Sequence, residues 1–475
     1  MIKLEKIAFW LTLTTFAFPL ATRLGNGYRL YLFELPLWCV YFLWAFRFGL
    51  KDQRLQMQRI DLYFFLFMAW LGVSVALNET WELGANTGWF WVKCYLVGFY
   101  LRHNLYRYYS LRSIMIFLMV ALFCEASLGL VQGITQTSIG AVQQYFGQEM
   151  EHISIYKAGV MSLVRVQGTF KHSNILGNWI VLLLPLVVAK ALMSTGRARL
   201  LYWVCSIVSA VTLVLTLSRG NWGAAVFGIT VMFYATGALT LKRINWPRFL
   251  LLGLIAGVYL ASLVFTYFDE LSLFSKALAE RVQMLPGSRS ESTRYNLILG
   301  SAELIAENPW FGVGLGKSNE LLHYTEYEIR DRFSSTVHNI FLIIATEGGI
   351  IGCLLFFLVL WRPFKHIYRI ARVKRETSGE ENRVAAAGMV GGYSAILFAM
   401  LWYTGMLDQA ELPLIMTFIH LAKALRPDQI VKPLVNGKID LAPQENKFHT
   451  NGKGHAAALP AHALTSFPVL EVSKN

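Results

Sequence analysis

The chain has 475 residues, of which 55% are hydrophobic and only 15% are charged, and its formal net charge is +14. Soluble proteins carry about 25% charged residues, so this composition excludes an ordinary soluble enzyme, a disordered chain and a secreted disulfide scaffold. About twelve apolar runs of roughly 20 residues predict an all-α integral membrane protein with about 12 transmembrane helices.

The apolar runs begin near residues 7, 30, 60, 83, 111 and 173, and then near 200, 220, 249, 338, 384 and 408. The first run follows Lys3 and Lys6 as a signal peptide would. Residues 18–23 make a poor cleavage site, so we expect an uncleaved anchor. The fourth run contains Lys93, a charge that a membrane helix accommodates only at a cost.

Basic residues gather in alternate connections between the runs, as the positive-inside rule requires when the N-terminus is cytoplasmic. The last inner connection is the richest and contains Arg362, Lys365, Arg369, Arg372, Lys374, Arg375 and Arg383. This pattern predicts a multi-pass protein with both termini in the cytoplasm. Topology and contact with anionic lipids explain the positive charge without nucleic acid.

Two long connections are predicted to face outward, at residues 136–172 and 269–337. The second should contain an amphipathic helix that opens near Arg294, presents Tyr295 and Ile298 on one face, and lies on the membrane surface. We therefore expect one membrane domain over residues 1–425, with a long helical outer loop. The polar tail, residues 426–475, is predicted to be a disordered cytoplasmic segment.

Six cationic or titratable side chains fall in or beside these outward segments, where the topology rule disfavours positive charge. They are Arg165, Lys171, Arg219, Arg289, Arg294 and His338. A bound anion would account for them, because guanidinium groups form paired, charge-assisted hydrogen bonds with diphosphate. A neutral histidine can accept a proton from a sugar hydroxyl. These residues predict a metal-free site for glycosyl transfer from a lipid diphosphate.

Structural interpretations stay open beside this one. Arg219 could reach lipid phosphates from its tight turn, and Arg289 and Arg294 could pair with loop acids. His338 could neighbour a helix N-cap. We interpret His172 as a capping residue rather than as the base.

Three acids lie inside apolar runs: Glu34, Glu125 and Glu347. Such residues are costly in a membrane and either serve function or lie in buried pairs. They support an alternative hypothesis, a transporter of lipid-linked glycans. Two long loops on the same side argue against a transporter, and a purely structural membrane protein would leave the clustered arginines unexplained.

Neither metal nor cofactor is expected. The five cysteines form no CxxC pair, and the outward carboxylates lack obvious ligand spacing. Asp269 and Glu270 are adjacent and would be the first ligands to test.

Short motifs occur in a fixed order along the chain. They are residues 165–179 (RVQGTFKHSNILGNW), 217–220 (LSRG), Arg294 with 308–314 (NPWFGVG), 337–339 (VHN) and 347–349 (EGG). In this order they resemble the O-antigen ligase/polymerase superfamily of bacterial membrane glycosyltransferases. The resemblance covers roughly residues 165–352, and the N-terminal third resembles the family only in being hydrophobic.

The resemblance implies a C-type glycosyltransferase-like fold in the bacterial inner membrane with its active site facing the periplasm. The donor would be a glycan on undecaprenyl diphosphate and the acceptor a sugar hydroxyl, with inversion at the anomeric carbon. Arg219 and Arg294 match the family's phosphate-binding arginines, and His338 matches its essential histidine. Arg289 lies five residues before Arg294, so both stay candidates. Arg165 and Lys171 complete the predicted diphosphate-binding set.

The acceptor stays open. A polymerase would use a lipid-linked repeat unit, whereas a ligase would use the lipid A core. The His-Ser-Asn and Val-His-Asn motifs favour a polymerase of O-antigen or exopolysaccharide over a ligase. A protein-directed oligosaccharide transferase is a third alternative.

Overall fold

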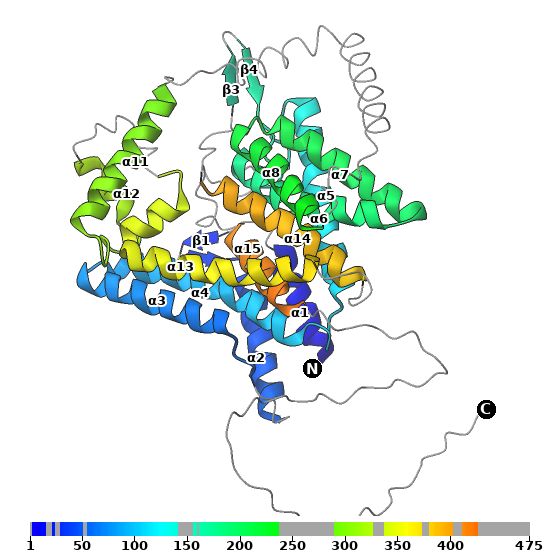
Figure 1. Cartoon of the computed structure of the whole chain (residues 1–475), viewed down its shortest axis with the longest axis horizontal. Coiled ribbons are helices and arrows are strands. Elements are labelled where there is room, and N and C mark those ends of the chain that lie inside the picture. The colour runs from blue at the N-terminus through cyan, green and yellow to red at the C-terminus, as the bar shows by residue number, and fades with distance from the viewer. Residues whose placement is uncertain are drawn as a thin grey trace, which may run out of the picture. The chain divides into compact units, whose positions relative to one another are not determined.

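The computed structural model describes residues 2–15, 21–23, 29–50, 55–140, 155–158, 161–236, 289–325, 337–372, 380–401 and 411–425. The predicted run near 249, the acids Asp269 and Glu270, and the tail at 426–475 lie outside these residues. Within them the chain is mainly helical (Figure 1).

The helices of the first part follow the predicted apolar runs. They are α1 (Ile2–Thr14), α2 (Glu34–Leu50), α3 (Arg59–Leu77), α4 (Trp81–Asn104) and α5 (Leu111–Thr135). The later helices are α6 (Ser173–Met193), α7 (Gly196–Leu215), α8 (Arg219–Ala235), α11 (Arg289–Glu307), α12 (Ser318–Leu321), η4 (Leu322–Tyr324), α13 (Ile340–Arg372), α14 (Glu380–Ala399) and α15 (Leu412–Ala424). Five described helices, α3, α5, α6, α7 and α13, are long and apolar enough to cross a membrane by length and composition.

Two short hairpins depart from the all-helical prediction. The first pairs β1 (Ala21–Arg23) with β2 (Arg29–Tyr31), and the second pairs β3 (Ile155–Ala158) with β4 (Met161–Val164). Both are antiparallel, with strands of three or four residues. Strands this short give too few residues for an alternating pattern in the sequence, so apolar periodicity missed them.

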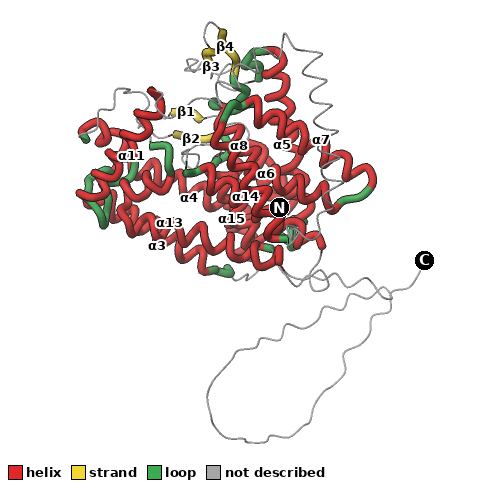
Figure 2. The backbone as a smooth tube through the Cα atoms, turned by 45° about the horizontal axis from the view of Figure 1, so that its top comes forward, coloured by secondary structure: helices red, strands yellow, loops and turns green. Residues whose placement is uncertain are grey.

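The helices pack around α6, which is hydrophobic on all sides and almost wholly buried, as expected for a helix at the centre of an assembly. The most extensive contacts are α14 against α8 and α6, α15 against α4, and α13 against α3. Figures 1 and 2 both show α3 and α13 running side by side. By contrast, most of α7 is exposed.

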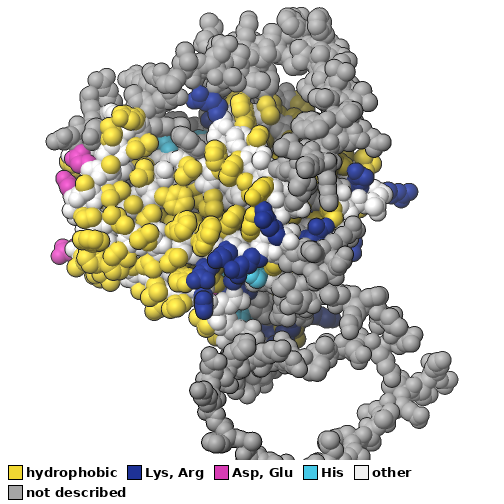
Figure 3. All heavy atoms as spheres, in the orientation of Figure 1, with side chains coloured by type: hydrophobic (Ala, Val, Ile, Leu, Met, Phe, Trp, Pro, Cys, Tyr) yellow, Lys and Arg dark blue, Asp and Glu magenta, His cyan; other side chains and the backbone are white. Residues whose placement is uncertain are grey.

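The exposed surface is largely apolar, which is typical of a protein that meets lipid. Large hydrophobic side chains stand out on several helices, for example Phe42 on α2, Phe65 on α3 and Leu201 on α7. Figure 3 shows a broad hydrophobic area on one face, with Lys and Arg side chains gathered mainly toward its lower edge.

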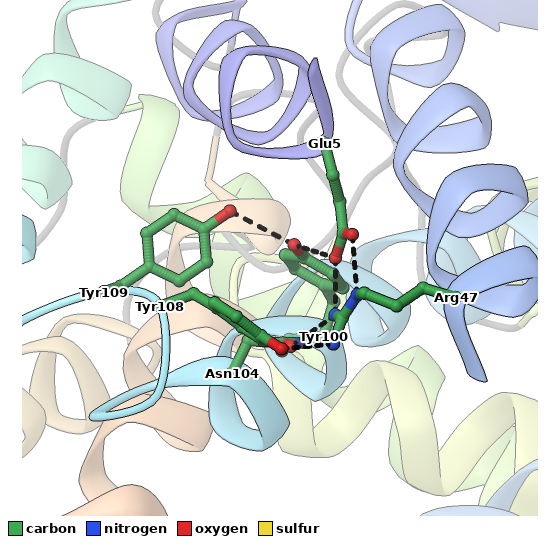
Figure 4. A network of polar contacts seen from close by, with 6 residues as sticks. All are labelled: Glu5, Arg47, Tyr100, Asn104, Tyr108 and Tyr109. Atoms are coloured by element: carbon green, nitrogen blue, oxygen red, sulfur yellow. Dashed lines mark hydrogen bonds and ion pairs between the residues drawn. The ribbon is translucent and has the colours of Figure 1, made fainter. Parts of the chain in front are cut away.

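One cluster of polar side chains ties α1 to α2 and α4 (Figure 4). Glu5 receives two hydrogen bonds from Arg47, at 2.7 and 2.9 Å, and one from the Tyr100 hydroxyl at 2.7 Å. Arg47 also donates to Asn104 Oδ1 at 2.9 Å and to the Tyr108 hydroxyl at 3.0 Å. The arginine and the glutamate are buried together, so each removes the cost of burying the other.

Two further buried ion pairs join helices of the same region. Lys93 of α4 donates to Glu34 Oε1 at the start of α2 at 2.6 Å, and both side chains are almost fully buried. The charge inside the fourth apolar run is thus neutralised by a neighbouring helix. Arg102 of α4 pairs with Asp61 of α3, because its Nη2 donates to both carboxylate oxygens, at 2.9 Å to Oδ1 and 2.7 Å to Oδ2.

Candidate active site

Several described helices, among them α6, α8, α13 and α15, begin at the end of the assembly that the sequence predicts to face outward, which we call the outer end. Hydrogen bonds join neighbouring segments there. Asn221 Nδ2 donates to the Asn174 carbonyl at 3.2 Å, and the Ile340 N–H donates to the Met400 carbonyl at 3.2 Å. Helix starts carry partial positive charge and N–H groups without intrahelical partners. The outer end is therefore electrostatically suited to an anion.

The segment 165–172, which precedes α6, is held on α5 by two buried side chains. Gln132 accepts the Gly168 N–H at 2.9 Å and donates to the carbonyl of the same residue at 2.8 Å. Glu125 accepts the N–H and the hydroxyl of Thr169 at 3.0 and 2.8 Å. Gly168 has a φ of +62°, and a Cβ atom there would strike the Glu125 carboxylate. The motif therefore needs glycine both for backbone angle and for space.

Arg165 joins the start of α6 to the turn before α8. Its Nε–H donates to the Thr216 carbonyl at 2.9 Å, and Nη2 donates to Asn174 Oδ1 at 3.1 Å. Both acceptors are neutral oxygens, so neither contact cancels the guanidinium charge. This predicted diphosphate ligand also has a structural role, because it fixes the turn that leads into Arg219.

Arg219 is the first residue of α8, and its side chain is half-buried. The preceding turn contains Leu217 with a φ of +52°, a region that non-glycine residues rarely occupy. Surrounding contacts hold this turn: the Leu217 N–H donates to the Val214 carbonyl at 3.0 Å, and Trp222 Nε1 donates to the Leu213 carbonyl at 2.9 Å. Backbone strain that is held in this way gathers at functional sites.

His172 is the N-cap residue of α6, since its Nδ1 accepts the Asn174 N–H at 3.1 Å. This confirms the capping interpretation. Burial chiefly, and then the charges of Arg165, Lys171 and His338, lowers the pKa of His172 to about 4. Its imidazole is therefore neutral at physiological pH. Three predicted site residues are thus near enough for their charges to act on His172.

His338 directly precedes the cap of α13 and is half-buried. Asn339 Oδ1 accepts the N–H groups of Phe341 and Leu342 at 3.0 and 3.2 Å, which makes Asn339 the capping residue. On the other side, Val337 is fully buried in a hydrophobic cluster with residues of α11. His338 is thus held between an anchored side chain and a capped helix start, as the N-cap neighbour that the sequence allowed.

Helix α13 is interrupted at Gly349, which has φ +71° and ψ −178°. The loop after α11 and helix α3 satisfy the backbone groups that the break releases. The Thr346 carbonyl accepts the Val313 N–H at 2.8 Å, and the Ile350 N–H donates to the Pro309 carbonyl at 2.8 Å. Trp70 Nε1 and Ser74 Oγ donate to the next two carbonyls, those of Gly348 and Glu347, at 2.8 and 2.7 Å. The NPWFGVG and EGG motifs therefore form one structural unit.

Arg289 and Arg294 lie in the first two turns of α11, and their side chains are outside the described part of the structure. The face predicted to meet the membrane is exposed at Tyr295 and Ile298. A second face, which the sequence reading missed, buries Leu297 in the same cluster as Val337. This packing brings the helix that carries Arg294 against the start of α13.

Each acid that kept the transporter hypothesis open binds a defined partner. Glu34 pairs with Lys93, Glu125 holds Thr169, and Glu347 accepts the Ser318 hydroxyl at 2.6 Å. Among the described residues, no three His, Cys, Asp or Glu side chains gather as metal ligands would. Metal independence stays a prediction.

Comparison with known proteins gives one family match. Residues 204–357, about a third of the chain, match a family model described as O-antigen ligase. This match supports the resemblance of the chain to the O-antigen ligase/polymerase superfamily. The matched segment includes Arg219, Arg289, Arg294 and His338, whereas Arg165 and Lys171 precede it. This match and the apolar helices support a glycosyltransferase-type protein of a bacterial membrane.

A chain from the solved structure described as "Structural coordination of polymerization and crosslinking by a peptidoglycan synthase complex" is 16% identical. The similarity covers 76% of this chain and 96% of that one, with a TM-score of 0.36. A TM-score this low does not establish a shared fold, so the C-type fold and the number of spans stay predictions. No curated protein matches this sequence.

The predicted site residues therefore fall into two described units at the outer end. Arg165, Lys171 and Arg219 belong to the α6–α8 side, and His338 belongs to the α11–α13 side. The sequence reading missed the polar residues that build them, such as Gln132 on α5. A polar residue inside an otherwise apolar run, as Gln132 is, could have indicated such a buried contact.

Proposed function

We propose that this protein transfers a glycan from undecaprenyl diphosphate to a sugar hydroxyl at the periplasmic face. Polymerisation of lipid-linked repeat units in O-antigen or exopolysaccharide synthesis is favoured, and ligation to the lipid A core is the alternative. The observation that carries this proposal is the family match over the segment that contains Arg219, Arg294 and His338.

Arg219 and Arg294 would hold the two phosphates. Arg219 opens α8, so its guanidinium and the partial positive charge of the helix start act in the same place. Arg289, Arg165 and Lys171 would add positive charge around the same anion. This charge would stabilise the diphosphate as it departs, without a metal.

His338 would act as the general base. In the proposed step the acceptor hydroxyl attacks the anomeric carbon, a new C–O bond forms, and the bond from that carbon to the diphosphate oxygen breaks. The hydroxyl proton passes to His338, undecaprenyl diphosphate leaves, and attack from the opposite face inverts the anomeric carbon. His172 is a poor candidate for this role, because its Nδ1 already accepts the Asn174 N–H.

The test replaces Arg219, Arg294 and His338 one at a time by Ala and measures transfer of lipid-linked glycan by purified protein in lipid. Each change should lower the rate at least about 100-fold, as the loss of a charge-stabilising donor does. Arg197→Ala is the matched control, because this exposed arginine lies in the first turn of α7, the helix that ends where the turn before Arg219 begins. Full activity in all three variants would refute the proposal.

A second measurement separates polymerase from ligase. In cells without the gene, loss of long chains with retention of single repeats indicates a polymerase. Loss of lipopolysaccharide-attached chains with retention of lipid-linked polymer indicates a ligase. Activity should also survive EDTA; loss that magnesium or manganese restores would refute the metal-free mechanism.

A further inference from the structure

The break in α13 creates a short outer half-helix, residues 340–348, that begins two residues after His338. A glycine with positive φ ends it, so continuous helix geometry does not fix its direction. Its orientation depends on the contacts that hold it, which come from the loop at 309–318 and from Trp70 and Ser74 of α3. That loop follows α11, the helix that carries Arg294. The half-helix and its loop therefore connect the predicted base to a predicted phosphate ligand.

Glu347 fastens the loop to the half-helix from within. Its side chain is only 4% exposed and accepts the Ser318 hydroxyl at 2.6 Å. The backbone N–H groups of Gly316 and Ser318 also donate to the carboxylate. One residue thus gathers three donors from the loop, while its own carbonyl accepts the Gly314 N–H at 3.2 Å. Several bonds that end on one buried carboxyl group hold the loop more firmly than a single bond would.

We propose that Glu347 is a positioning residue for glycosyl transfer: by clamping Ser318 and the loop, it fixes the outer half-helix and hence His338 relative to α11. This inference rests on the proposed function for its catalytic consequence. Glu347 does not act as the base itself. It lies nine residues after His338, and at about 1.5 Å per residue the two are roughly 13 Å apart along the helix.

The clamp is tested with Glu347→Gln, Ser318→Ala and the double variant. Glutamine keeps the volume of glutamate but turns an N–H₂ group toward backbone donors, and alanine removes the hydroxyl. Hydrogen exchange of the purified protein in lipid reports the structural link. We expect amides in 309–318 and in 337–345 to exchange about tenfold faster or more in each variant, as loss of a buried hydrogen bond implies.

The catalytic consequence is measured on the same samples. We expect kcat to fall about tenfold or more, with the KM for lipid-linked donor within about twofold, because a displaced base impairs the chemical step more than binding. The double variant should resemble the worse single variant, since both changes break one interaction.

Ser301→Ala is the matched control. Ser301 is a fully buried serine on α11 whose hydroxyl donates to the Leu297 carbonyl of its own helix at 2.7 Å. It should leave exchange at 337–345 and kcat unchanged. Unchanged exchange at 337–345 in the Glu347 and Ser318 variants would overturn the clamp, and unchanged kcat despite faster exchange would overturn its positioning role. If wild type transfers no lipid-linked glycan, the proposed function fails, whereas exchange, which needs no substrate, still decides the clamp.

Discussion

Arginines at the two ends of the helix assembly differ in their described hydrogen-bond partners, as a comparison of Arg47 and Arg102 with Arg165 shows. At the end opposite the outer end, Arg47 and Arg102 are 1% and 3% exposed, and each meets a carboxylate at 2.7 Å. At the outer end, Arg165 is half-buried, and its two described contacts end on neutral oxygens. An arginine neutralised by an acid holds helices together, whereas the two described contacts of Arg165 orient its guanidinium group through neutral oxygens. The difference separates structural arginines from those suited to bind an anion.

The largest expected effect tests the neutralised arginines. Replacing Arg102 by Ala leaves Asp61 buried without its guanidinium partner and should lower the free energy of unfolding by roughly 3–5 kcal/mol. Combining Arg102→Met with Asp61→Asn should recover much of that loss, because no buried charge is left. Denaturant unfolding in lipid or detergent measures both. A double variant as unstable as the single one would contradict the assignment of this pair.

A change at Arg165 should lower the transfer rate more than it lowers the stability of the protein. Arg165→Lys keeps the charge but cannot reach both Thr216 and Asn174 with one ammonium group. The free energy of unfolding should fall by about 2 kcal/mol or less. The transfer rate should fall about tenfold, because the turn before Arg219 loses its brace. An activity loss no larger than that of Arg197→Ala would remove Arg165 from the site.

The smallest effect concerns pH. The folded protein holds the pKa of His172 near 4, whereas in the unfolded chain it lies near the ordinary value of about 6.5. The unfolded state therefore takes up the proton first as the pH falls, and stability from this group, complete above pH 6.5, is lost toward pH 4. Between pH 7 and 5.5 the loss should be about 1 kcal/mol.

His172→Asn keeps a capping side chain and removes this titration. Thermal unfolding of the variant should therefore depend less on pH over that interval than unfolding of the wild type. An equal drop in both proteins would show that other groups cause it. The result also bears on the comparison of the two ends, since it reports how strongly cations at the outer end lower the pKa of the neighbouring His172.

Much of the helical framework could be predicted from the sequence. Apolar runs located the membrane helices because lipid and a packed core both require apolar side chains. The first long connection was predicted at residues 136–172, and in the structure α5 ends at Thr135 and α6 begins at Ser173. The capping role of His172 followed from its place before a helix start. Family motifs located the candidate residues, but not which of them lie together.

The remaining features depend on contacts between distant segments. The acids Glu125 and Glu347 inside apolar runs indicated that each needs a polar partner. The local sequence around them does not identify these partners, which are Thr169 and Ser318. The buried face of α11 was missed because its polar Ser301 interrupts the apolar spacing and donates instead to Leu297 within its own helix. Such partners are fixed by how helices pack, and a single sequence does not state that packing.

The buried pair of Glu34 and Lys93 has a consequence for biogenesis. Each of these charges is costly in hydrocarbon while its helix is alone, and the cost disappears only when the two meet. During synthesis α2 leaves the ribosome first, so its glutamate must wait near the translocon until α4 arrives. The pair therefore favours early association of α2 and α4 in the bilayer, since their meeting removes the cost of both charges.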